Sequence, residues 1–254
     1  MNGSPVAKLQ LLNNLSHKDL RVFTRYGAQY GDNVGSVLTF PVEYDDLHKE
    51  YPVLLRRHPT HGLQSVALLG FSAQENLFLN ELYPSPPSAG SWMARYVPAM
   101  IAKGPFMIGY QQQDGQSEPV IHVDMDHPRI SHDAGEGTAV FLPKGGQSGY
   151  LQKIASTLQR LDTGQKEADL FYREMEHLNL LVPVNFTLTL NSGEKISVEG
   201  HETICSETFA SLPSHTLSEL HRKGWLNYII FLQSSLANMN WLIEMKNAME
   251  IVRT

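Results

Sequence analysis

The stretch Pro52-Val53-Leu54-Leu55-Arg56 is followed, after the turn-forming residues Pro59-Thr60-His61-Gly62, by Gln64-Ser65-Val66-Ala67-Leu68-Leu69-Gly70. Two short apolar runs on either side of a turn that contains proline and glycine predict an antiparallel β-hairpin. The same reasoning predicts further strands and hairpins along the chain. They cover residues 37–42, 106–110, 120–124, 139–141, 180–184, 186–190 and 195–200.

Apolar residues recur at helical spacing in other parts of the chain. They do so between Tyr150 and Leu161 and again between Ala168 and Leu178, and Thr163-Gly164 predicts a break between these two helices. The tail Trp225–Thr254 has an apolar face with gaps and predicts the longest helix. Shorter helices are predicted at residues 42–50, 95–103 and 207–212, the last capped by Ser206, and after the cap Ser214.

This order of elements predicts an α+β fold. Strands dominate the middle of the chain and helices concentrate at residues 150–180 and 206–250, unlike the regular alternation of a wound parallel sheet. We therefore expect a single domain with a mainly antiparallel central sheet. Composition shows no sharp break, so this domain is expected to cover residues 1–254, with residues 1–35 as a partly extended lead-in.

Composition and charge argue against several classes of protein. The net charge is −6 and the isoelectric point about 6.0, so no nucleic-acid-binding surface is expected, although Leu54–His58 is locally basic. The one cysteine, Cys205, can form no disulfide within the chain. Residues 1–14 lack the features of a signal peptide, and no apolar run is long enough to span a membrane. We expect a cytoplasmic protein.

The stretch Trp92–Phe106 is rich in aromatic residues, carries two prolines and has only two charges. It belongs to an ordered series of short motifs. The series is Glu43, Tyr51-Pro52-Val53, Ala67-Leu68-Leu69-Gly70, Asn76-Leu77-Phe78, Trp92, Tyr96-Val97-Pro98-Ala99, Pro105-Phe106, Val123-Asp124, Phe141, Leu180-Leu181, Gly193, Gly200, Gly224-Trp225-Leu226 and Ser234. In this order the motifs resemble the SapC-like family of bacterial proteins, over roughly residues 37–240. The Pro84–Gly90 loop is where the chain departs from that pattern.

The resemblance implies a role but no reaction. The family takes its name from a protein linked with the export of surface-layer protein, and members occur near TonB-dependent receptors, flavin-dependent halogenases and oxygenase-like proteins. The resemblance therefore implies an accessory or binding protein of a system that takes up, exports or processes an envelope substrate. The implied partners are a peptide, protein or small-molecule substrate and a modifying enzyme or transporter.

Arg95 is the best candidate for recognition, because a guanidinium beside aromatic side chains suits a carboxylate. Trp92 and Tyr96 could line a pocket or peptide groove with it, or could pack in the core, which is the commoner role of aromatic residues. Glu43 could share the site or be the structural ion-pair partner of Arg95. With Asp124 these residues form the predicted binding set, and a shared site requires Glu43, Arg95 and Asp124 to converge.

The segment His122-Val-Asp124-Met-Asp126 offers an alternative. On a strand, His122 and Asp124 share one face, and with His201 or His221 they would match the facial triad of a non-haem iron, 2-oxoglutarate oxygenase-like enzyme. The simpler interpretation places Asp124 and Asp126 in a turn at the end of the strand. His201 and Cys205 could meet only on a helix, so a small buried thiol is expected instead of a nucleophile.

The sequence contains no nucleophile elbow, P-loop or dinucleotide-binding glycine motif. We therefore expect no cofactor, and the sequence favours a protein without turnover while leaving an enzyme open. A second alternative is a structural subunit of a larger complex. That alternative predicts exposed apolar surface on the C-terminal helix, and an oligomer is compatible with it.

Overall fold

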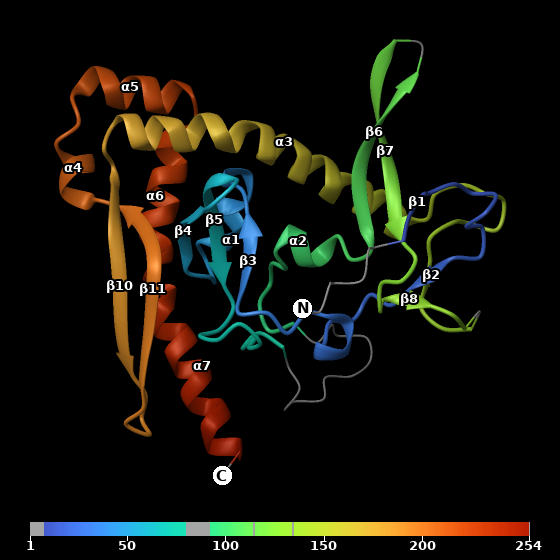
Figure 1. Ribbon diagram of the computed structural model, residues 1–254, viewed down its shortest axis with the longest axis horizontal. Helices are drawn as coiled ribbons and strands as arrows, with labels where there is room; N and C mark the ends of the chain where they lie inside the picture. The colour runs from blue at the N-terminus through green and yellow to red at the C-terminus, as the bar shows by residue number, and fades with distance from the viewer. Residues whose placement is uncertain (1–7, 80–91, 114, 134, 254) are drawn as a thin grey trace. The chain divides into compact units, whose positions relative to one another are not determined.

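The computed structural model describes residues 8–79, 92–113, 115–133 and 135–253, so the Pro84–Gly90 loop lies outside the described ranges. Helices and strands are both abundant, and every pairing between the named strands is antiparallel (Figure 1). The predicted α+β class with antiparallel sheet is therefore confirmed. Within the described ranges, no helix is both long and apolar enough to cross a membrane.

The chain divides into two compact units. Unit 1 comprises Met1–Asp32, Leu79–Trp92 and Ala99–Asp162, and unit 2 comprises Asn33–Phe78, Met93–Pro98 and Thr163–Thr254. The chain passes from one unit to the other several times, so neither is a continuous segment. That the whole chain folds as one domain stays a prediction.

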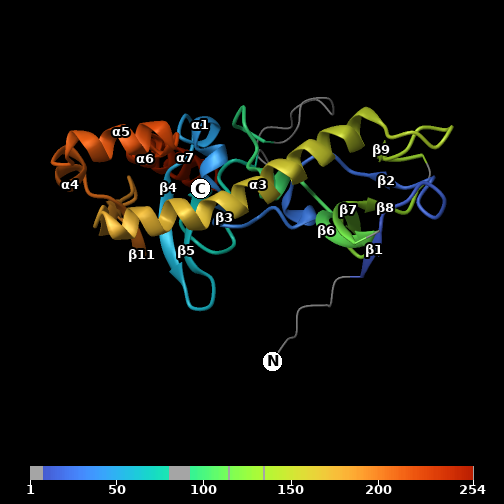
Figure 2. The ribbon, with the colours of Figure 1, turned by 90° about the horizontal axis from the view of Figure 1, so that it is seen from above.

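Unit 1 contains two three-stranded sheets. The first has the order β1 (Leu9–Leu11), β7 (Gln116–Asp124), β6 (Phe106–Gln113), and the second has the order β8 (Ile130–Ser131), β2 (Arg21–Val22), β9 (Thr138–Ala139). The short helices η1 (Ala28–Tyr30) and α2 (Ala99–Ala102) belong to the same unit. Figure 2 shows β1 beside the β6–β7 hairpin. That hairpin confirms the strands predicted at residues 106–110 and 120–124, and both extend further toward the turn.

The core of unit 1 combines its sheets with the first part of helix α3, which runs from Gly149 to His177. Apolar residues at helical spacing bring one face of α3 onto the strands. The buried members of this cluster are Leu20, Val22, Phe106, Val123, Ile130, Val140, Phe141, Leu151, Ile154 and Leu158. The same apolar spacing that predicted the helix therefore also forms the core.

A buried ion pair joins two distant segments of unit 1. Both carboxylate oxygens of Asp32 accept hydrogen bonds from Arg129 Nη2 at 2.7 Å. Asp32 also accepts a hydrogen bond from the Gly27 amide at 2.9 Å, and the Arg129 guanidinium lies 4.7 Å from the ring centre of Tyr26. Only 4% of the Arg129 side chain and 6% of the Asp32 side chain are exposed. Each charge therefore depends on the other for compensation.

Replacement of Asp32 by asparagine should lower the free energy of unfolding by about 3–5 kcal/mol, because Arg129 would keep a buried charge without its counter-ion. Urea unfolding measures this loss. Asp19→Asn is the matched control, since Asp19 pairs with Lys18 where both side chains are mostly exposed. An exposed pair contributes little, so the control should unfold like the wild type. Equal effects of the two substitutions would contradict the assignment.

Unit 2 is built on a five-stranded sheet in the order β10, β11, β4, β5, β3. The strands are Leu181–Thr189, Lys195–Ile204, Val53–His58, Gly62–Leu68 and Ser36–Thr39 respectively. The predicted hairpins are confirmed as β4–β5 and β10–β11. Val53, Leu54 and Leu55 are all buried, so β4 carries apolar side chains on both of its faces, as its continuous apolar run requires.

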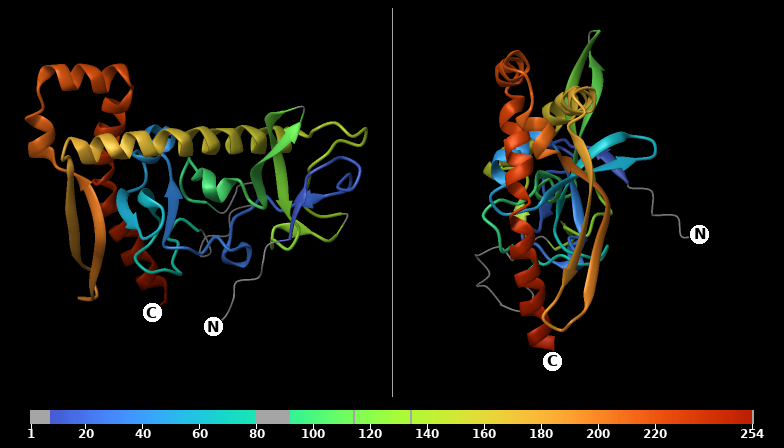
Figure 3. Two further views of the ribbon diagram at one scale, coloured as in Figure 1. Left: turned by 45° about the horizontal axis from the view of Figure 1, so that its top comes forward. Right: turned by 90° about the vertical axis from the view of Figure 1, so that its left-hand side faces the viewer.

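The helices of unit 2 follow β3 and β11. They are η2 (Pro41–Glu43), α1 (Tyr44–Leu47), α4 (Ser206–Ala210), α5 (Ser214–Arg222), α6 (Trp225–Ser235) and α7 (Asn238–Arg253). Ser206 and Ser214, predicted as caps, are the first helical residues of α4 and α5. Figure 3 shows α6 and α7 (red) running beside the β10–β11 hairpin, and the Asn191 amide donates a hydrogen bond to the Asn247 side chain at 2.8 Å.

The prediction of a single helix from Trp225 to the end of the chain is wrong, because α6 ends at Ser235 and α7 begins at Asn238. Ser235 bonds to the backbone of the first residue of β4, and Asn238 bonds to the backbone before that strand. The Val53 amide donates to Ser235 Oγ at 3.0 Å, and Asn238 Nδ2 donates to the His48 carbonyl at 2.7 Å. These tertiary hydrogen bonds fix the turn, and the apolar pattern contains no trace of them.

The break predicted at Thr163-Gly164 is also wrong, because α3 is continuous through it. Gly164 has a packing role instead. A Cβ atom there would lie 2.6 Å from Val42 Cγ2 and 2.9 Å from Phe40 Cβ. The missing side chain lets the α3 backbone approach the segment that follows β3, although glycine costs about 1 kcal/mol of helix propensity relative to alanine.

Gly164→Ala should lower the free energy of unfolding by about 1–3 kcal/mol, because the added methyl group overlaps two packed side chains. Thermal or urea unfolding measures the change. Gly149→Ala is the matched control, since a Cβ at this first residue of the same helix meets nothing within 4 Å. The control should be neutral or slightly stabilising. A stability gain in Gly164→Ala would contradict the packing role.

Candidate ligand pocket

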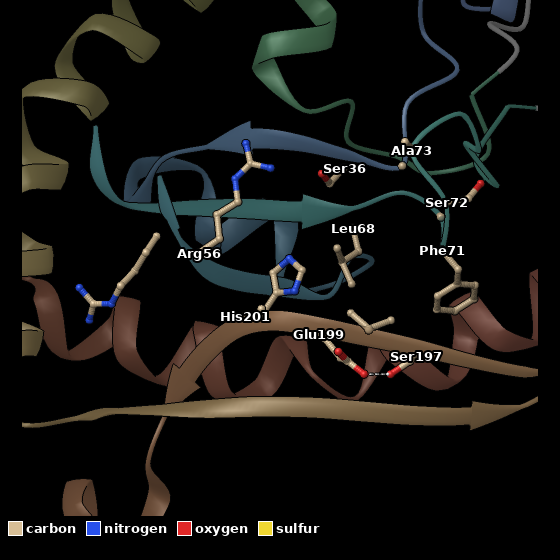
Figure 4. Close-up of a pocket in the computed structure, with 14 residues that line it drawn as sticks. Ser36, Arg56, Leu68, Phe71, Ser72, Ala73, Ser197, Glu199 and His201 are labelled. Atoms are coloured by element: carbon tan, nitrogen blue, oxygen red, sulfur yellow. Dashed lines mark hydrogen bonds between the residues drawn. The ribbon is translucent and has the colours of Figure 1, made fainter. Parts of the chain in front are cut away.

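A cavity of about 380 Å³ lies against one face of the five-stranded sheet of unit 2 (Figure 4). Its walls come from β3, β4, β5, β11 and the loop that follows β5. The lining residues are Gly35, Ser36, Arg56, Arg57, Leu68, Gly70, Phe71, Ser72, Ala73, Ser197, Val198, Glu199, Gly200 and His201. Pockets of this volume hold small molecules.

The pairing of β11 with β4 places Arg56 and His201 next to each other. Glu202 pairs with Leu55 in this antiparallel ladder. His201 therefore stands opposite Arg56, and the alternation of side chains along a strand turns both to the same face. Figure 4 shows the two side chains on the same side of their strands, with Arg56 on β4 and His201 on β11.

Arg57 alternates to the opposite face and is paired with two carboxylates. Its Nε donates to Glu202 Oε1 at 2.7 Å, and its Nη1 donates to Glu176 Oε1 at 2.6 Å. The hydrogen bonds to Glu202 and then Glu176 raise the pKa of Arg57. Because Glu202 is on β11 and Glu176 is on α3, the guanidinium ties three elements together and holds the register of β11 on β4.

Arg56 and His201 are left without such compensation. The Arg56 guanidinium has no ion-pair partner within the described residues, and its buried Nε has no hydrogen-bond acceptor there. Nδ1 of His201 is also buried and has no hydrogen-bond partner in the part of the chain that the structure describes. A buried polar group that makes no hydrogen bond costs about 1–3 kcal/mol. Both atoms therefore belong to side chains that a ligand could stabilise.

The environment of His201 favours its neutral form. Burial lowers the pKa of the imidazole, the nearby backbone of Glu199 opposes that effect, and the charge of Arg56 adds to the lowering. At neutral pH the pocket therefore presents the guanidinium of Arg56 beside an uncharged imidazole ring. An acidic group that binds between them would restore the proton of His201.

A β-bulge sets the direction of His201. The β10–β11 ladder shifts between Val184 and Phe186, where β11 carries an extra residue. Gly200 lies at this point with φ of 75°, a left-handed conformation that favours glycine. Bulges bend a strand and redirect the next side chain, and they are common beside functional sites.

The loop that follows β5 forms a fixed wall of the pocket. The Gly35 amide donates to the Ala73 carbonyl at 3.1 Å, and the Gly70 amide donates to the Gly35 carbonyl at 3.0 Å. A side chain on Gly35 would overlap the carbonyl oxygen of Ser72. Glycine at this position therefore allows the loop to close directly on the start of β3.

Glu75 anchors the same loop from its far end. Its Oε2 accepts a hydrogen bond from the Phe71 amide at 2.9 Å, and its Oε1 accepts one from Lys246 Nζ of α7 at 2.6 Å. Less than a fifth of either side chain in this ion pair is exposed. Sheet, loop and C-terminal helix thus hold the pocket wall in place.

The sequence was compared with protein families, with curated proteins and with solved structures. The SapC family model matches residues 12–242 of the 254-residue chain. The chain belongs to the SapC family. The match includes every residue that lines the pocket. No curated protein and no solved structure matches the chain.

Two of the SapC motif residues predicted to bind, Glu43 and Tyr96, come together in unit 2. Glu43 is fully buried. Its carboxylate accepts hydrogen bonds from Tyr96 Oη at 2.8 Å and from Thr39 Oγ1 at 3.0 Å. These bonds tie the end of β3 to residues 93–98, which is a structural role. That the pair also binds a ligand stays a prediction.

Arg95 pairs with Glu50, so the alternative that Glu43 is its structural partner is wrong. Its Nε donates to Glu50 Oε1 at 3.2 Å, and the Glu50 carboxylate also accepts the amides of Arg95 and Tyr96. The Arg95 side chain is 82% exposed.

The helix predicted at residues 95–103 is shorter in the structure, where α2 covers only Ala99–Ala102. Pro98 disfavours a helical conformation in the residue before it, so the helix begins after the proline.

Trp92 and Asp124, the other predicted binding residues, belong to unit 1. Trp92 is almost buried and meets the ring of Tyr26 edge-on at 5.4 Å, which is core packing. Asp124 ends β7, and its Oδ1 accepts the Asp126 amide at 3.1 Å. This is the turn that the simpler interpretation of the acidic pair predicted. The convergence of Glu43, Arg95 and Asp124 stays a prediction.

The predicted iron ligands are divided between the two units, and that they hold iron together stays a prediction. The ring of His122 lies across Gly109 of β6, where an added Cβ would be 2.6 Å from its Cε1 atom. Across the described part of the SapC chain, no group of three or more histidine, cysteine, aspartate and glutamate side chains is placed to hold a metal ion. His122 and Asp124 belong to unit 1, whereas His201 and His221 belong to unit 2.

The sequence does not single out Arg56 as a site residue, and it points to His201 only as a metal ligand or a partner of Cys205. The sequence contained one signal, the consecutive arginines Arg56 and Arg57 on a predicted strand. Alternation requires two such residues to face opposite sides of the sheet. Which of them finds carboxylates depends on the pairing of β4 with β11, and the sequence pattern does not reveal that pairing.

Cys205 is only partly buried, so the expected buried thiol is wrong. It occupies the N-cap position of α4, whose first turn follows directly. A hydrogen bond with the Thr208 side chain is the main cause that lowers the pKa of this thiol. The SapC chain therefore carries an accessible cysteine with enhanced thiolate character.

The rate at which iodoacetamide alkylates Cys205 should rise at lower pH than for an ordinary thiol, because only the thiolate reacts and its folded-state pKa is lowered. Thr208→Val removes the hydroxyl and should move the pH profile upward. Thr208→Ser keeps a hydroxyl and serves as the control. Identical profiles for wild type and Thr208→Val would contradict this cause.

Proposed function

We propose that this SapC family protein is a cytoplasmic bacterial binding protein, accessory to a system that takes up, exports or processes an envelope substrate. It holds a peptide, protein or small-molecule substrate for a separate modifying enzyme or transporter. Family membership and the earlier resemblance support the setting. The pocket of unit 2 supports the binding role.

The observation that carries the proposal is the uncompensated guanidinium of Arg56. Folding alone gains nothing from a partly buried cation without a carboxylate, and buried polar groups in native proteins are nearly always hydrogen-bonded. Departures of this kind are concentrated at functional sites. A ligand that supplies a hydrogen-bond acceptor would satisfy the buried N–H group of Arg56.

The structural-subunit alternative has a weaker basis. Two large apolar side chains, Ile230 on α6 and Trp241 on α7, are nearly half exposed. Single exposed apolar side chains are common on soluble proteins and need no partner to explain them. The pocket is therefore the better guide to function.

Affinity isolation from native extract tests the binding role. Wild-type protein should retain a specific small molecule or protein, identified by mass spectrometry, and Arg56→Met should lose it. Arg173→Met is the matched control, because Arg173 is an exposed arginine of α3 outside the pocket and its loss changes the net charge equally. The control should retain the same ligand as the wild type.

Two results would contradict the proposal. Equal recovery with wild type and Arg56→Met would show that the pocket does not bind the ligand. Turnover of the recovered ligand by the purified protein alone would replace the accessory role with an enzymatic one.

A further inference from the structure

We propose that the pocket formed by β3, β4, β5 and β11 binds the carboxylate of a small monoanionic molecule, with Arg56 as the anion-binding residue and His201 beside it. This inference deepens the proposed binding function and rests on it. It names the chemical class that the pocket recognises and the two side chains that recognise it.

The charges around the pocket favour a single negative charge. Among the described residues that line the pocket, Arg56 is the cation without a carboxylate partner, since the charge of Arg57 is shared between Glu202 and Glu176. Glu199 also lines the pocket, and its Oε1 accepts a hydrogen bond from Ser197 Oγ at 2.6 Å. This carboxylate opposes a dianion such as phosphate more strongly than it opposes a monoanion.

The shape of the donor group points to a carboxylate. A guanidinium offers parallel N–H groups in a planar fork that matches the two oxygens of a carboxylate. The buried Nε of Arg56 has no acceptor among the residues described, so its N–H is available to a bound oxygen. Leu68, Phe71 and Val198 supply apolar surface for the rest of a small ligand.

His201 makes this recognition dependent on pH. The charged groups that line the pocket around it are Arg56 and Arg57 of β4 and Glu199 of its own strand, while β3, β5 and the loop after β5 contribute only uncharged residues. A bound carboxylate beside the imidazole favours the protonated ring. Binding therefore takes up a proton, and affinity rises as the pH falls through the titration of His201.

Nuclear magnetic resonance titration of the full chain tests the proposal with benzoate as the probe. Benzamide is the neutral control of the same shape, and inorganic phosphate at about pH 8, where it is mainly a dianion, is the control for charge. Benzoate should shift the Nε–H resonance of Arg56 and the amides of residues 197–201 to saturation. Benzamide and phosphate should bind at least about tenfold more weakly, as expected for loss of a charge-assisted hydrogen bond.

Variants separate binding from folding. Arg56→Met should weaken benzoate binding about tenfold or more, and Arg56→Lys should keep part of it because the charge remains without the fork. Arg173→Met should bind like the wild type. Between about pH 8 and about pH 6 the wild type should tighten about threefold or more, whereas His201→Gln should change little.

Equal shifts with benzoate and benzamide, tighter binding of phosphate, or unchanged binding by Arg56→Met would overturn the carboxylate site. Its failure is distinguishable from failure of the proposed function. A ligand recovered from extract that depends on Arg56 but carries no carboxylate would leave the binding role standing and refute this inference.

Discussion

The pairing of β11 with β4 is the contact on which the pocket of unit 2 depends. It rests on the ladder that joins Glu202 to Leu55 and on the Arg57 guanidinium, which binds Glu202 on β11 and Glu176 on α3. A slip of one residue would turn every side chain of β11 to the other face. Glu202 would then lie beside Arg56 and neutralise it. The observed register is thus what leaves Arg56 uncompensated.

Three arginines of this chain differ in their burial and in the carboxylates that pair with them. Arg129 is buried and bound by both oxygens of Asp32, and Arg57 is largely exposed and shared by two glutamates. Both stabilise the fold. Arg56 faces a cavity with no carboxylate bound to it within the described residues, although its neighbour in the sequence has two. Membership of the SapC family gives no ligand, so the chemistry of this residue is the most specific guide to one.

Much of the fold follows from local sequence. The hairpins β4–β5, β6–β7 and β10–β11 were predictable because turn residues and apolar runs lie next to each other in the chain. The continuity of α3 through Gly164 and the break after Ser235 were not predictable from local sequence, because contacts with residues distant in the chain determine both. Val42 and Phe40 explain the glycine, and the backbone at Val53 explains the break.

The candidate site was less predictable than the fold. The motif residues Glu43 and Tyr96 do meet, but Glu50 rather than Glu43 engages Arg95. Arg56 and His201 lie far apart in sequence, and only the strand register and the bulge at Gly200 bring them to one face. No local pattern encodes either feature, so the sequence alone led to the aromatic stretch instead.

The register of β11 on β4 is most directly tested by nuclear Overhauser contacts between the two strands in the full chain. Contacts between the backbone protons of Leu55 and Glu202, together with contacts between the Arg56 side chain and the His201 ring, are the predicted result. Contacts of the His201 ring with Leu55 or Arg57 side chains in place of Arg56 would show the opposite face and contradict the account.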